Sequence, residues 1–131
     1  MIWVEVFAVF VVCHLVGDFV LQTDWQARNK YGGMGKDRER RMALWSHVVV
    51  YTLCFVPALV WIGIETEFSR AVLVGLLIFW PHYVQDDGRL LDAYMRRVKG
   101  LSQGGNLSLR VAVDQSFHLV FLFGTALLVA G

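Results

Sequence analysis

Residues 2–22 read IWVEVFAVFVVCHLVGDFVLQ, an apolar run that nevertheless carries His14 and Asp18. A helix needs about 20 mostly apolar residues to cross the hydrocarbon core of a bilayer. A charged group near the centre of that core costs about 3 kcal/mol on insertion scales, so it needs a compensating partner. The stretch therefore predicts a transmembrane helix that contributes to a buried polar site.

The rest of the chain is also predominantly apolar. Of its 131 residues, 56% are hydrophobic, which exceeds the ~45–50% that is usual in soluble domains. The apolar residues gather in four blocks of spanning length, at about residues 2–22, 43–64, 68–86 and 107–130. These blocks leave little sequence for a soluble core. We therefore predict one all-α domain over residues 1–131, an integral membrane four-helix bundle.

The basic residues predict the orientation of this bundle. Eleven of the twelve fall between residues 28 and 41 or between residues 89 and 110, and only Arg70 lies in the opposite link. Short loops rich in Lys and Arg stay in the cytoplasm. We expect a multipass protein of the cytoplasmic membrane with both termini outside.

Residues 89–99, RLLDAYMRRVK, have apolar side chains on one helical face and charged side chains around the rest. This pattern predicts a short amphipathic helix in the cytoplasmic headgroup layer. Asn106 or Ser108 is suited to cap the helix that follows.

The four histidines lie one in each apolar block, and three of them have an aspartate four residues away. The pairs are His14–Asp18, His82–Asp86 and Asp114–His118, and His47 completes the set. Residues four apart share one face of a helix. Counted along the alternating helices at 1.5 Å per residue, most of these groups lie roughly 5–15 Å below one surface. They are therefore expected to meet in the bundle interior.

Several aspartates in one bundle repel one another unless protons or cations hold them together. Neutral imidazole and carboxylate are ordinary ligands of divalent metals, so we predict a metal site, with zinc first and iron or manganese as alternatives. The candidate ligands are His14, Asp18, His47, His82, Asp86, Asp114 and His118. Seven ligands exceed one tetrahedral ion. A dinuclear site and a single ion with carboxylates orienting histidines both remain open.

Four segments together resemble a family of small bacterial multipass proteins catalogued as domain of unknown function 3307. The segments are HLVGDFVLQTDWQARNK (14–30), ALWSHVVVYT (43–52), HYVQDDGR (82–89) and DQSFHLV (114–120). The resemblance implies family polar positions at the seven candidate ligands and at Gln22 and Gln115. The third motif of that family usually continues to a Lys, whereas Asp87 and Arg89 follow here. The motif style is also similar to that of membrane-bound metal-dependent hydrolases.

These residues favour a membrane-embedded metal-dependent hydrolase that acts at the cytoplasmic leaflet. The metal would activate water, and Asp18 or Asp114 would act as the base. Membrane lipid is the expected surrounding, and Arg89 and Arg110 are suited to hold an anionic lipid headgroup or a phosphate substrate.

Two other functions remain open. The polar cluster could fasten a structural or accessory subunit of a larger membrane complex, or a homo-oligomer. It could also form part of a proton or metal-ion transporter. Paired histidines ligate haem in some proteins, but carboxylates one turn away suit a hard metal better. No nucleic-acid-binding motif is present, and nucleic acid is not an expected partner.

Overall fold

The computed structural model describes residues 1–101 and 105–131, which form helices and connecting turns without a β-strand. The elements in chain order are α1 (Trp3–Leu15), the π-helical turn η1 (Val16–Val20), α2 (Asp24–Asn29), α3 (Arg38–Cys54), α4 (Val56–Glu65), α5 (Phe68–Asp86), α6 (Arg89–Arg97) and α7 (Leu107–Ala130). The predicted all-α class is confirmed.

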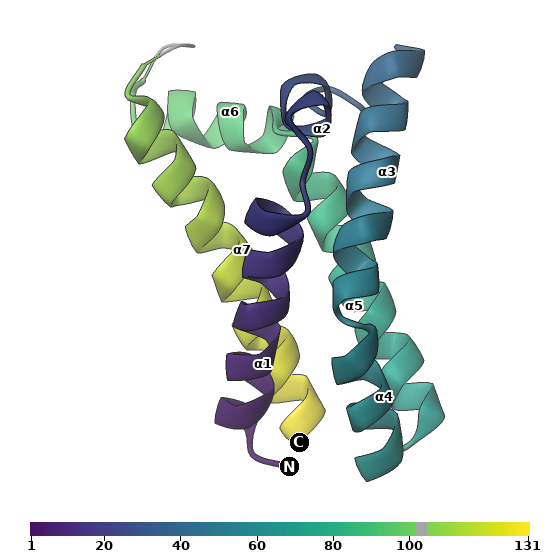
Figure 1. The fold of residues 1–131 in the computed structure, drawn as a ribbon. Helices are drawn as coiled ribbons and strands as arrows, with labels where there is room; N and C mark the ends of the chain where they lie inside the picture. The colour runs from purple at the N-terminus through teal and green to yellow at the C-terminus, as the bar shows by residue number, and fades with distance from the viewer. Residues whose placement is uncertain (102–104) are drawn as a thin grey trace.

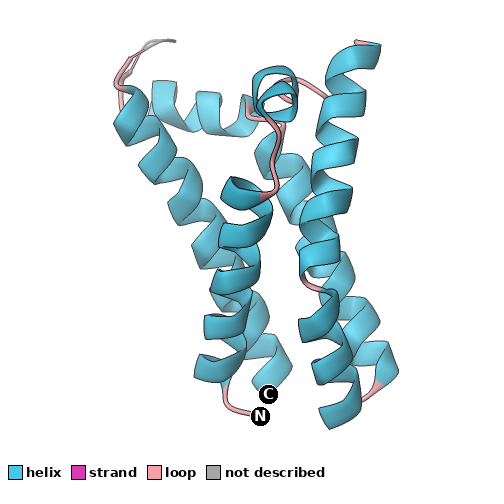
Figure 2. Cartoon of the chain, viewed as in Figure 1, coloured by secondary structure: helices cyan, strands magenta, loops and turns pink. Residues whose placement is uncertain are grey.

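The long helices run side by side, and the short helices α2 and α6 lie together at one end (Figure 1). Both termini lie at the opposite end. Helix α1 packs chiefly against α7, while α3, α4 and α7 all pack against α5. Short loops connect most of these helices, as Figure 2 shows. Most of the basic residues therefore lie at the end that carries α2 and α6.

Within the described residues, Trp3–Val20 and Leu107–Ala130 are long and apolar enough to span a membrane. The bent pair Arg38–Cys54 and Val56–Glu65 makes a third candidate if it counts as one span. These lengths and compositions indicate membrane association. Helix α5 has the predicted bounds of 68–86 but is not among the candidates, and its last turns carry polar groups.

The first predicted helix, 2–22, is interrupted. Its α-helical part ends at Leu15, and a π-helical turn continues to Val20. Gly17 lies in this turn against α3, where an added Cβ would meet Cδ2 of Tyr51 at 2.7 Å. The wider turn and the missing side chain let the two helices approach closely at this point. Such turns are common at functional sites.

The second predicted helix, 43–64, is also different in the structure. It begins earlier, at Arg38, because the Asp37 side chain accepts a hydrogen bond from the Arg40 N–H at 3.0 Å and caps it. It then breaks at Phe55 with a bend of 45° between α3 and α4. Pro57 follows the break, and proline lacks the N–H that would bond to the preceding turn.

The bounds of α6 and α7 agree closely with those predicted from the sequence. α6 covers Arg89–Arg97 of the predicted 89–99 and buries Leu91 and Met95. Asn106 caps α7 as predicted, because its side chain accepts a hydrogen bond from the Leu109 N–H at 3.0 Å.

The buried core divides into two zones along the helices. A largely apolar cluster fills the space toward the termini and includes Val6, Phe10, Ile62, Val74 and Ala126. The buried histidines lie in the other half, toward α2 and α6. The fold therefore places its polar groups near the end that carries the basic residues.

Candidate metal centre

Four buried donor atoms from three elements converge on one point. They are Oδ1 of Asp18 on η1, Nε2 of His47 on α3, and Nε2 of His82 and Oδ2 of Asp86 on α5. All four ligand atoms lie within 4.8 Å of one another. This is the one group of its kind among residues 1–101 and 105–131.

Five of the six distances among these atoms are close to the edge lengths of a tetrahedral site. His47 Nε2 lies 3.2 Å from Asp18 Oδ1, 2.8 Å from Asp86 Oδ2 and 3.1 Å from His82 Nε2. His82 Nε2 lies 3.3 Å from each of the two carboxylate oxygens. A regular tetrahedron with ligands about 2.0–2.1 Å from zinc has edges of about 3.3–3.4 Å. The group is therefore close to the size that a single small divalent cation requires.

The buried imidazoles of this group are incompletely satisfied by the protein. Nδ1 of His47 and Nδ1 of His82 have no hydrogen-bond partner. The two Nε2 atoms face each other, and a hydrogen bond between them uses one proton and one lone pair. Buried polar atoms are normally paired, and a metal ion held between the two Nε2 atoms and the two carboxylates would satisfy these donors. The ring of Tyr51 stacks on His82, with centroids 3.4 Å apart, and holds that imidazole in place.

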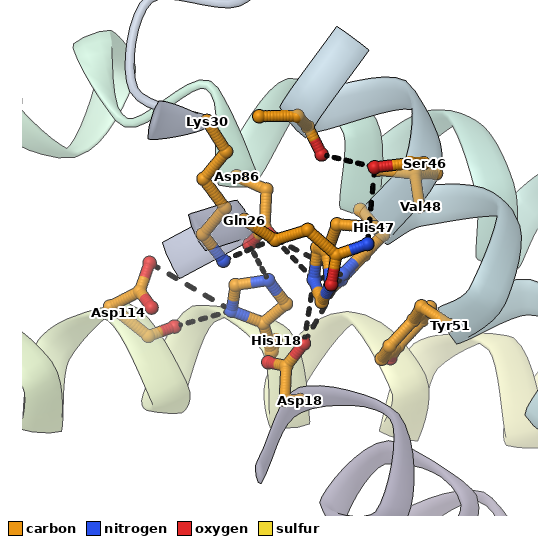
Figure 3. Close-up of polar contacts among 12 residues, drawn as sticks. Asp18, Gln26, Lys30, Ser46, His47, Val48, Tyr51, Asp86, Asp114 and His118 are labelled. Atoms are coloured by element: carbon orange, nitrogen blue, oxygen red, sulfur yellow. Dashed lines mark hydrogen bonds and ion pairs between the residues drawn. The ribbon is translucent and has the colours of Figure 1, made fainter. Parts of the chain in front are cut away.

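A lysine approaches the group from the α2 side. Lys30 follows the last turn of α2, and its Nζ donates to Asp86 Oδ2 at 2.6 Å (Figure 3). A capping box between Thr23 and Gln26 starts α2, and the Gln26 side chain donates to Ser46 of α3. These contacts fix α2 above the site. Hydrogen bonds to a ligating carboxylate are typical of protein metal centres.

His118 on α7 contacts the same aspartate from the other side. Its Nδ1 donates to the backbone carbonyl of Asp114 at 2.8 Å, because a carbonyl can only accept. Its Nε2 therefore carries a lone pair in the neutral form and lies 3.2 Å from Asp86 Oδ1. A proton shared between His118 and Asp86, or an intervening cation, would make this contact attractive.

His14 lies beside the group with its ring nitrogens already paired. Nε2 donates to the Gln115 side-chain oxygen at 2.8 Å, and Nδ1 accepts from the Tyr51 hydroxyl at 3.0 Å. Nδ1 is also 3.7 Å from Asp18 Oδ2. In this tautomer His14 positions the Tyr51 hydroxyl and offers no proton to Asp18.

Asp114 is the most exposed of the seven candidate residues. Its side chain is 28% exposed, and its Oδ1 lies 3.9 Å from His118 Nδ1. It lines a cavity of about 280 Å³ between α2, α6 and α7, whose wall also includes Lys30, Asp86 and Arg110. The centre therefore has access to this cavity through Asp86.

The structure thus brings all seven predicted residues into one region and four of them to one point. Tyr51 and Lys30 belong to the same network, although the sequence analysis assigned neither to the site. Tyr51 follows His47 by four residues, so its position on the same helical face was detectable. Lys30 lies in a loop with several basic residues, and no feature of the sequence predicted its contact with Asp86.

A family model described as a protein of unknown function (DUF3307) matches residues 6–130. No curated protein and no solved structure matches the chain.

Proposed function

The chain belongs to the DUF3307 family, whose description assigns no activity, and we propose that it is a membrane-embedded metal-binding protein with metal-dependent hydrolase activity at the cytoplasmic leaflet. The observation that carries this proposal is the convergence of two imidazole nitrogens and two carboxylate oxygens, all buried. Zinc is the first candidate, because it favours four nitrogen and oxygen ligands in a tetrahedron.

The geometry favours a single ion over two. Asp18, His47, His82 and Asp86 supply one complete tetrahedral set. His118 then contacts Oδ1 of Asp86, while Oδ2 is the oxygen that belongs to the group of four. Second-shell groups of this kind orient ligands and tune the metal. His14 lies beside Asp18, with Nδ1 3.7 Å from Asp18 Oδ2.

The cavity beside Asp86 supports hydrolysis. Four protein donors already fill a tetrahedron, so a hydrolytic ion here would have to take water as a fifth ligand, and it would then lower the pKa of that water toward neutrality. Asp114 faces this cavity but is outside the group of four, so it is free to accept a proton from water. Asp18 is buried within the group and fits the role of ligand, so Asp114 is the stronger candidate for the base.

A structural role is the second candidate. An ion at this point would join η1, α3 and α5, three elements that are distant in the sequence. Structural zinc sites contribute directly to folding. In this case the protein would be an accessory subunit, and loss of the metal would unfold it. The largely apolar core toward the termini gives no corresponding support to a transporter.

The membrane arrangement belongs to the same proposal. We place α1, α3 with α4, α5 and α7 across the cytoplasmic membrane of a bacterium as four spans. The shared position of both termini and the basic residues at the opposite end support this placement (Figure 1). The metal centre then lies near the cytoplasmic surface.

Elemental analysis of detergent-purified protein tests the metal centre. We expect about one zinc, iron or manganese ion per chain. Asp18→Asn is expected to weaken binding by more than ~100-fold, beyond the 10–100-fold that is typical of outer-shell changes. The control is Asp24→Asn, since Asp24 pairs with Arg28 on the surface and is 77% exposed.

Three results would be informative about this proposal. If the purified unchanged protein contains no metal, and added zinc alters neither its helix content nor its thermal stability, the proposed metal centre is contradicted. Metal loss accompanied by unfolding would favour the structural role. Metal loss without unfolding would favour the enzyme, and circular dichroism measured on the same samples distinguishes the two.

A further inference from the structure

The cavity beside the metal centre has an unusual charge balance. Its wall carries the cations Lys30 and Arg110 and the acids Asp86 and Asp114. Both cations are partly buried, with 19% of the Lys30 side chain and 30% of the Arg110 side chain exposed. Apart from Gln85 and Tyr31, the remaining wall is formed by glycine and apolar side chains.

Both cations are held by buried carboxylates. Lys30 Nζ lies 2.6 Å from Asp86 Oδ2, and Arg110 donates to Asp92 of α6. Asp86 Oδ2 is also one of the four metal donors. When a divalent ion shares the charge of Asp86, the Lys30 ammonium is neutralised less. Metal loading therefore makes the cavity more electropositive at the point nearest the ion.

We propose that the metal-loaded cavity binds a phosphate group, held by Lys30 and Arg110 beside the metal centre. This inference rests on the proposed function and names the chemical class of its ligand. An Arg guanidinium offers paired donors to phosphate oxygens, and Lys supplies a compact positive charge. Asp114 on the same wall accepts a hydrogen bond from a protonated phosphate oxygen.

The size of the cavity points to a phosphate ester. Its volume of about 280 Å³ exceeds what inorganic phosphate fills and approaches the lower range of small-molecule sites. A phosphorylated lipid headgroup and a soluble phosphate ester share this chemistry. The amphipathic helix α6 borders the cavity and would lie at the lipid surface, which is the position a headgroup would reach.

Phosphate titration of the full-length, zinc-loaded protein in phosphatidylcholine nanodiscs tests the inference. Isothermal calorimetry with inorganic phosphate gives the affinity, and the bound zinc is counted in every sample. Lys30→Gln is expected to keep zinc and to weaken phosphate binding by about tenfold or more, the value of one charge-assisted hydrogen bond. Arg110→Gln is expected to do the same.

The matched control is Arg28→Gln, which removes one positive charge from α2 at an exposed position outside the cavity. Its affinity for phosphate is expected to equal that of the unchanged protein. Equal affinity in all three variants would overturn the inference, as would zinc-loaded protein that binds no phosphate. Protein without any metal would overturn the proposed function first, and this inference with it.

A second titration identifies the source of the phosphate. Nanodiscs that contain phosphatidic acid present the headgroup from the bilayer. If they suppress binding of inorganic phosphate in the zinc-loaded protein but not in Lys30→Gln, the ligand is a lipid headgroup. If inorganic phosphate binds equally with and without phosphatidic acid, the ligand is a soluble phosphate ester.

Discussion

Gly17 in η1 allows the backbone after α1 to pack closely against α3. An added Cβ would lie 2.7 Å from Tyr51 Cδ2 and 3.3 Å from Tyr51 Cα, and the second atom belongs to the backbone. Tyr51 in turn stacks on His82 and hydrogen-bonds His14. A change at Gly17 is therefore expected to reach the candidate metal centre through the Tyr51 ring.

We predict that Gly17→Ala destabilises the protein by about 1–3 kcal/mol, the usual cost of overpacking. Gly124→Ala is the control, because a Cβ at Gly124 in α7 meets nothing within 4 Å. That change is expected to be neutral or stabilising by up to about 1 kcal/mol. Chemical unfolding in detergent measures both. Equal stabilities of the two variants would refute the close approach.

Asp114 and Asp86 are predicted to behave differently when the charge is removed. Asp114→Asn keeps the four donors intact, so the bound metal is expected to stay near the unchanged stoichiometry while hydrolysis is lost. Asp86→Asn removes a donor and is expected to weaken metal binding by more than ~100-fold. Metal content after gel filtration compares the two, and metal loss in Asp114→Asn would place that residue among the ligands.

The sequence predicted that these polar side chains would lie close together. It did not predict which of the seven would supply the four converging donor atoms. Spacing of four residues and a shared depth predicted that Asp18, His47, His82 and Asp86 would meet. The rotation of each helix decides which donors face one another, and the π-helical turn at Asp18 changes that rotation locally. For the same reason, nothing in the spacing showed that His14 would pair with Gln115.

At the level of elements, α6 is joined to its neighbours through one carboxylate. Asp92 accepts hydrogen bonds from Tyr31, in the loop after α2, and from Arg110 of α7. The backbone of the same loop bonds to the turn before α6, where the Gly32 N–H donates to the Asp87 carbonyl at 2.8 Å. These contacts tie α6 to the loop after α2 and to α7, next to the cavity wall formed by Tyr31, Leu91 and Arg110.

The Asp92 contacts predict a dependence on pH. Burial raises the pKa of Asp92, but the hydrogen bonds from Tyr31 and Arg110 and the charge of Arg96 outweigh it and lower the pKa overall. A lowered pKa in the folded state stabilises the protein above the ordinary value of about 4. This contribution is lost as the pH falls through the folded-state pKa.

Asp92→Asn is therefore expected to cost about 1.5–3 kcal/mol near neutral pH, the range for hydrogen bonds to a charged group. The difference from the unchanged protein is expected to shrink below about pH 4. Thermal melts across this range measure it. Asp24→Asn, at an exposed ion pair, is the control and is expected to cost less than about 1 kcal/mol. A difference independent of pH would contradict the assignment.

Element boundaries were predictable where local chemistry sets them. Asn106 and the apolar block after it predicted α7, and the bounds of α5 agree with the hydropathy of 68–86. The break at Phe55 depends on Pro57 and on packing of the two halves against α5. Since a proline can also be tolerated inside a membrane helix, hydropathy alone could not predict that break.

At the scale of the whole molecule, the charge distribution and the positions of the termini support the orientation that we propose. The termini share one end, and Arg70 at that end donates to the Val129 carbonyl at 2.9 Å. The other basic residues belong to the opposite end. The four spans that we propose would put both termini on the same side of the membrane.

We predict that both termini face away from the cytoplasm. Alkaline phosphatase fused to either end is expected to be active, and green fluorescent protein fused there is expected to be dark. The same reporters inserted after Lys36 are expected to give the opposite result. Fluorescent terminal fusions would reverse the orientation and place the metal centre near the outer surface.

The positions of the four donors in the chain have a consequence for synthesis. Asp18, His47, His82 and Asp86 all belong to the first 86 residues, so a nascent chain contains all four candidate ligands before α7 leaves the ribosome. An ion captured at that stage would hold the early helices together while the last one is still being made. α7 would then pack last against these helices and add Gln115 and His118 beside an ion that is already bound.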